Sequence, residues 1–68
     1  MSEWTKQRRL RARITSLEVH ISAWATIALD DARSKVERAD AIDRIVALSM
    51  KVAEAKREIS YLRTIGIV

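Results

Sequence analysis

Two stripes of apolar residues, each advancing in steps of four and three, dominate this sequence. The first stripe lies within residues 10–28 and the second within residues 41–62. Such steps mark one face of an α-helix, whereas a strand would alternate every second residue. The stripes are out of phase, because continuing the first one lands on Asp31, Lys35 and Arg38. The pattern therefore predicts two helices rather than one unbroken rod. The stripe members are Leu10, Ile14, Leu17, Ile21, Trp24 and Ala28, then Ala41, Ile45, Leu48, Val52, Ala55, Ile59 and Leu62.

A capping motif separates the two stripes. Ser34 is followed three residues later by Glu37, which fits a capping box in which the serine hydroxyl accepts from the Glu37 N–H and the glutamate reaches back. Two aspartates just before Ser34 suit a helix C-terminus poorly, because the helix dipole is negative there. The sequence therefore predicts helices at about 3–31 and about 35–64. Ion pairs are expected around the turn among Asp30, Asp31, Arg33, Arg38, Asp40, Asp43 and Arg44.

Folding the chain back at residues 32–33 brings the two stripes into contact. An antiparallel hairpin with this turn pairs residues whose numbers add up to 65 or 66, so Ile14 meets Val52 and Trp24 meets Ala41. Large residues then face small ones in several layers, as interdigitation requires. We predict an all-α fold, an antiparallel two-helix hairpin.

The composition leaves such a hairpin short of stabilising interactions. Residues 1–68 form one small domain, and a chain of this size buries only about 60% of its unfolded surface. No Cys is present, so disulfides and thiolate metal sites are excluded, and the single His20 leaves little metal chemistry. Small domains that lack these supports commonly gain stability from a partner subunit. We expect an oligomer without a metal or a cofactor.

Catalytic and membrane functions find no support in the sequence. No Ser or Cys is paired with an identifiable base, and no Glu lies on either stripe, where a helical bundle would build a metal site. Two helices also offer no cleft for a small-molecule substrate unless an oligomer builds one. The longest uncharged stretch, 19–29, is far shorter than the roughly 20 residues of a membrane span. We expect a cytoplasmic, non-enzymatic protein with no membrane association and no small-molecule substrate.

The second helix carries apolar residues beyond those of its stripe. Ile42, Val46, Met50 and Ala53 share a face that lies more than about 90° from the stripe. Scattered surface hydrophobes are normal, but an aligned row favours an interface. The predicted partner is a second copy, in a two-fold dimer that forms an antiparallel four-helix bundle; a trimer or a dedicated protein partner would cover the row equally well. The first helix is expected to add Trp4, Ser22, Ala25 and Leu29 to this side.

The net charge of +4 is concentrated at the N-terminus. Five cations within residues 1–17 oppose Glu3 alone, and the hairpin brings Lys51 to the same end. Glu58 should approach two of these cations and neutralise part of the patch. Three interpretations remain open: a solvated charged surface, a phosphate-binding surface, or a docking site for an acidic protein. The cations concerned are Lys6, Arg8, Arg9, Arg11, Arg13 and Lys51.

Trp4 lies off the stripe, beside Arg8 and Arg11. It can cover the open end of the hairpin together with Tyr61 and Ile65, or it can anchor a partner, because Trp and Arg are frequent hot-spot residues.

Two functions follow from these surfaces. The first is a protein-interaction module, which would act as a regulator, inhibitor or assembly factor of the kind that phages and plasmids encode. The alternative is a small basic bundle that binds RNA or DNA through phosphate contacts. In its two antiparallel helices the chain resembles the Rop-type RNA-binding bundle, although it shares no sequence motif with it, and this resemblance implies an RNA partner.

Overall fold

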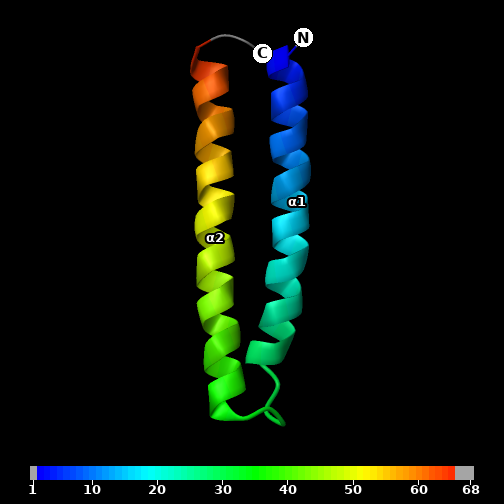
Figure 1. The fold of residues 1–68 in the computed structure, drawn as a ribbon, viewed down its shortest axis with the longest axis vertical. Coiled ribbons are helices and arrows are strands. Elements are labelled where there is room, and N and C mark those ends of the chain that lie inside the picture. Colours follow the sequence, from blue (N-terminus) through cyan, green and yellow to red (C-terminus); the bar gives the residue numbers. More distant parts are fainter. Residues whose placement is uncertain (1, 66–68) are drawn as a thin grey trace.

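The chain forms two long helices that run antiparallel (Figure 1). A computed structural model describes residues 2–65, with side chains from residue 5 onward. Helix α1 spans Ser2–Ala28 and helix α2 spans Lys35–Thr64. The molecule measures 49 × 15 × 12 Å, so each helix extends along almost its whole length. The predicted all-α hairpin is confirmed.

The two predicted stripes meet along the seam between α1 and α2. Ile14 packs with Val52, Ala55 and Ile59 in the core, and Leu10, Leu17 and Ile21 of α1 pack against this cluster. The predicted contact between the Ile14 and Val52 layers is therefore confirmed. Near the turn, Ala41 is 0% exposed.

Trp24 is half-buried rather than enclosed, although its position on the seam predicts a core residue. The guanidinium carbon of Arg44 lies 4.9 Å from the centroid of the Trp24 ring, within the range of a cation–π contact. Arg44 of α2 therefore covers part of a ring that the seam leaves partly exposed.

Helix α1 ends at Ala28, earlier than the predicted residue 31. The backbone N–H of Asp30 donates to the carbonyl of Ile27 at 3.2 Å, which tightens the last turn. The Asp30 carboxylate then accepts from the N–H of Ala32 at 2.9 Å, and the Asp30 carbonyl accepts from the N–H of Arg33 at 3.0 Å. Aspartate commonly closes turns in this way, so the chain reverses over residues 29–34 without a glycine.

The start of α2 agrees with the prediction. The Ser34 hydroxyl accepts from the Glu37 N–H at 3.2 Å and donates to the Glu37 carboxylate, also at 3.2 Å. Arg33 lies 3.1 Å from the same carboxylate. Hydrogen bonds from Arg33 and then from Ser34 lower the pKa of Glu37, while Glu37 raises the pKa of Arg33. The predicted capping box is confirmed.

Arg38 joins the two helices at the closed end of the hairpin. Its Nε donates to the carbonyl of Ala28 at 3.0 Å, which satisfies one of the carbonyls left unpaired at the end of α1. Its guanidinium also lies 3.8 Å from the Asp31 carboxylate. The predicted ion pairs around the turn are present for Arg33 with Asp30 and for Arg44 with Asp40 as well.

Candidate interaction surfaces

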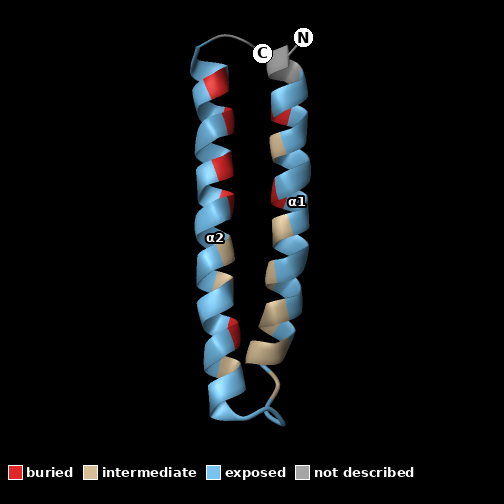
Figure 2. Ribbon diagram, viewed as in Figure 1, coloured by how far each residue is buried: buried red, intermediate tan, exposed pale blue. Residues whose placement is uncertain are grey.

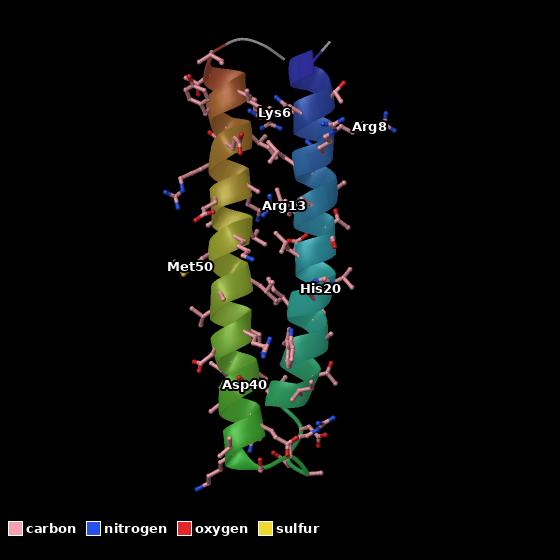
Figure 3. The ribbon with its side chains drawn as sticks, in the orientation of Figure 1. Lys6, Arg8, Arg13, His20, Asp40 and Met50 are labelled. Atoms are coloured by element: carbon pink, nitrogen blue, oxygen red, sulfur yellow. The ribbon has the colours of Figure 1, made fainter. Side chains whose placement is uncertain are left out.

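A row of apolar side chains on α2 lies outside the seam. Ile42, Val46 and Met50 are 52%, 54% and 63% exposed, and Ala53 is exposed beside them. Figure 3 shows the Met50 side chain directed away from α1. The structure therefore places the four predicted interface residues of α2 on one accessible face, as the helical spacing required.

This row is longer than the sequence analysis proposed. Val36 and Tyr61 are 79% and 62% exposed, and both share the phase of the row, as does the exposed Ala39. The row thus advances from residue 36 to residue 61 in steps of three and four. Between Ala53 and Tyr61 the step falls on Arg57, which is the one charged residue in the row. We name this set the outer stripe: Val36, Ala39, Ile42, Val46, Met50, Ala53 and Tyr61.

Helix α1 contributes little to this side of the molecule. Leu29 is highly exposed but lies in the turn, after the end of α1. Ser22 is exposed and Ala25 is half-buried, so neither offers a large apolar surface. The side chain of Trp4 lies outside the described residues. The accessible apolar surface therefore belongs mainly to α2.

The cations of the N-terminal half of α1 lie at the open end of the hairpin. Lys6 forms an ion pair with Glu58 across the two helices, with a distance of 3.1 Å between Nζ and the carboxylate, as predicted. Arg13 and Lys51 line one groove of about 70 Å³, which confirms that α2 brings a lysine beside the cations of α1. Leu10, Ala55, Glu54 and Glu58 complete the groove.

Several of these cations have no ion pair with another described side chain, a set made up of Arg9, Arg11, Arg13 and Lys51. In Figure 3 Arg13 lies toward α2, whereas Arg8 points away from it. The cations therefore surround the N-terminal half of α1 instead of forming one plane. A single flat partner could contact only part of the set at once.

The buried Gln7 was missed by the sequence analysis. It is 4% exposed, and its side-chain nitrogen has no hydrogen-bond partner among the described residues. The signal was available in the sequence, because Gln7 lies three residues before Leu10 and so continues the first stripe. An apolar stripe ends on a polar residue here, and this burial is unfavourable.

The described part of the chain shows neither a metal site nor a membrane-spanning helix. Among residues with described side chains, no group of His, Asp and Glu is arranged to hold a metal ion. Neither described helix combines the length and apolarity that crossing a bilayer requires. The two candidate surfaces are the outer stripe and the groove lined by Arg13 and Lys51, called the basic groove below.

Comparison with known proteins adds no relative: no family model, no curated protein and no solved structure matches this chain. The class of protein is therefore defined by the fold and the exposed surfaces only. It is a helical hairpin whose second helix is apolar on two sides.

Proposed function

We propose that this chain is a non-enzymatic protein-interaction module of the cytoplasm that associates with a second copy of itself through the outer stripe. The observation that carries the proposal is the exposure of Ile42, Val46 and Met50 in one row on α2. A row of large apolar side chains in water is unfavourable, and covering it contributes about 25 cal/mol for each Å² of apolar surface removed from water. Association is the direct way to gain this free energy.

The total surface supports the same proposal. The molecule exposes 5292 Å². A compact monomer of 7.8 kDa exposes about 4,400 Å² by size scaling, so the hairpin exposes roughly 900 Å² more. Each partner in a standard protein interface buries about 800 Å². The excess surface of the hairpin is therefore of the size that one interface covers.

The weak internal core also favours association. Among the described residues, the seam of one hairpin contains no large side chain that is completely buried. Folding of such a chain gains from any partner that binds the folded state alone. The basic end of α1 lies away from the outer stripe and stays accessible in the dimer. There it would contact the protein that this regulator, inhibitor or assembly factor controls.

Charge placed on the outer stripe tests the proposal. The double variant Val46→Glu, Met50→Glu should sediment as a monomer at concentrations at which the parent chain is a dimer, because carboxylates resist burial. Val19→Glu is the matched control, since Val19 is 61% exposed on α1 and lies outside the stripe. This control should retain the parent mass. A monomeric parent chain, or a double variant of unchanged mass, would contradict self-association through this face.

A second function, binding of RNA or DNA, rests on a separate observation. Arg9, Arg13 and Lys51 are exposed near one another without ion pairs to described side chains, and could contact phosphates. Glu54 and Glu58 line the same groove and would repel a polyanion, which makes this the weaker candidate.

The dependence of binding on salt concentration distinguishes the two proposed functions. Binding through about three phosphate contacts should weaken by more than ten-fold between 50 and 200 mM salt. Self-association through an apolar stripe should change little over that range. Fluorescence anisotropy of a labelled duplex RNA, a duplex DNA and a single strand would measure the first. Sedimentation of the chain alone would measure the second.

A further inference from the structure

We infer that the two copies pack with α2 of one molecule antiparallel to α2 of the other, so that their two outer stripes contact each other and run in opposite directions. The inference rests on the proposed self-association and adds to it the orientation of the partner. It also assigns a role to Arg57, the charged residue that interrupts the stripe.

The sizes of the side chains favour the antiparallel orientation. Residues whose numbers add up to 95–97 lie opposite each other when the stripe is reversed about its centre. Each of the larger residues then meets a smaller one, which is the condition for interdigitated helix packing. The facing pairs are Tyr61 with the partner's Val36, Arg57 with the partner's Ala39, Ala53 with the partner's Ile42, and Met50 with the partner's Val46.

A parallel arrangement would align each residue with its own copy. The small Ala39 and Ala53 would each face their own copies and leave gaps, whereas Tyr61 and Met50 would each face an equally large residue. Native cores avoid such voids, because a cavity loses contacts that nothing replaces. The alternation of large and small residues along the stripe is therefore better satisfied in the reversed direction.

Charge along the stripe favours the same orientation. In a parallel pair Arg57 would face its own copy within the contact, and like charges in close approach are unfavourable. In the antiparallel pair the aliphatic part of Arg57 covers the partner's Ala39. The partner's Asp43 lies about one helical turn beyond that alanine, where it attracts the Arg57 guanidinium. The opposed helix dipoles add a further favourable contribution.

This packing leaves the basic surface available. Met50 points away from α1 (Figure 3), and the other members of the outer stripe share its helical phase, so the first helices of the two copies lie outside the α2 pair. Arg9 and Arg13 then face solvent in both copies. The dimer would present two equivalent basic grooves, one on each molecule.

Cysteine cross-linking tests the orientation without background, because the natural chain contains no Cys. Two single variants are required, Ile42→Cys and Ala53→Cys, and one of them should carry a size tag. A disulfide needs its two Cα atoms within about 7 Å. Positions 42 and 53 are about 16 Å apart along a helix, so the two orientations give opposite cross-linking patterns.

The expected result is a disulfide-linked heterodimer when the two variants are mixed and oxidised, with each variant alone linking no more than the Val19→Cys control. Efficient linking of each variant with itself, and no linked heterodimer in the mixture, would show a parallel dimer. That outcome would overturn the orientation and leave the proposed self-association intact. No linking above the control in any sample, for a chain that still sediments as a dimer, would place the contact elsewhere. A monomeric parent chain would overturn both proposals.

Arg57 provides a second measurement. In the antiparallel dimer Arg57→Gln removes an attraction to the partner's Asp43, so the dissociation constant should rise by about two- to five-fold. In a parallel dimer the same change removes a repulsion, and the dissociation constant should fall. Arg63→Gln, on the same helix but off the stripe, is the control and should have little effect. An unchanged or lower dissociation constant for Arg57→Gln would contradict the proposed placement of this residue.

Discussion

The closed end and the open end of the hairpin are held together by different interactions. At the closed end, hydrogen bonds and ion pairs of Asp30, Arg33, Ser34, Glu37 and Arg38 fix the turn. Most of the buried positions are gathered toward the open end (Figure 2), and among the described residues Ala41 is the buried one near the turn. One half is organised by polar geometry and the other half by burial.

The polar contacts of the closed end therefore determine where the chain turns, whereas apolar burial at the open end stabilises the packing of the two helices. Polar contacts at exposed sites have small free energies but strict geometry, so they determine where the chain reverses. Burial of apolar surface is larger in free energy and less directional. We therefore expect substitutions in the open half to change stability most, and substitutions near the turn to change it less.

The largest effect is expected from Ile14→Ala, in the core of the open half. Loss of a buried isoleucine side chain should lower the free energy of unfolding by about 3 kcal/mol, which is a large part of the stability of so small a domain. The matched variant Ile45→Ala lies on the same seam, half-buried and closer to the turn, and should cost about 1 kcal/mol. Urea unfolding followed by circular dichroism, at one fixed protein concentration, measures both.

Equal losses from Ile14→Ala and Ile45→Ala would contradict the contrast between the two ends. A larger loss from Ile45→Ala would reverse it and show that the closed half contains the stabilising core. Repeating the titration at a ten-fold lower protein concentration separates loss of the seam from loss of association, because association depends on concentration.

Much of this contrast could be predicted from the sequence, for reasons that differ by residue. The second helix begins at Lys35 as predicted, because a serine followed by a glutamate three residues later acts through local contacts alone. The end of α1 was predicted too late, since it depends on Asp30 accepting from Ala32 and on Arg38 reaching Ala28 from the other helix. The Asp30 contact is local and its signal was in the sequence, whereas the contact of Arg38 with Ala28 joins the two helices and is not contained in a local pattern.

The next effect concerns the capping residue of the closed end. Ser34→Ala removes the hydroxyl that accepts from the Glu37 N–H, and should lower the free energy of unfolding by about 1 kcal/mol. Ser16→Ala is the control, because Ser16 is exposed in the middle of α1, where alanine is the better helix former. The control should be neutral or slightly stabilising. A loss in Ser16→Ala as large as that in Ser34→Ala would argue against a specific role for the cap.

The open end carries one polar residue whose removal should increase stability. Gln7→Leu replaces a buried amide without a described hydrogen-bond partner by an apolar group of similar size, and should raise the free energy of unfolding by up to about 1 kcal/mol. Gln7→Glu is the comparison variant and should be strongly destabilising, because it buries a charge. A loss of stability in Gln7→Leu would show that the amide is satisfied in solution and contributes to the alignment of the helices.

The candidate surfaces were predictable to a different degree. The positions of Ile42, Val46, Met50 and Ala53 followed from helical spacing, whereas Val36 and Tyr61, near the two ends of α2, were not predicted as part of the row. The ion pair of Lys6 with Glu58 followed from the pairing of the two stripes. Helical spacing places the outer stripe on one face, but it does not identify a partner, because association depends on a second surface as well.

The smallest expected effect is a dependence on pH at the closed end. Hydrogen bonds from Arg33 and Ser34 lower the pKa of the Glu37 carboxyl from its ordinary value of 4.5, so ionised Glu37 stabilises the folded state. This contribution is complete above pH 4.5 and is lost as the pH falls through the lowered pKa of the folded state. Thermal unfolding of the parent chain and of Glu37→Gln between pH 2 and pH 7 measures it. The parent chain should lose more stability than the variant on acidification. Because the Glu37 carboxylate is exposed, this difference in stability should be much smaller than the loss caused by Ile14→Ala. Superimposable profiles would show that the Arg33, Ser34 and Glu37 contacts define the turn without contributing to the stability of the folded hairpin.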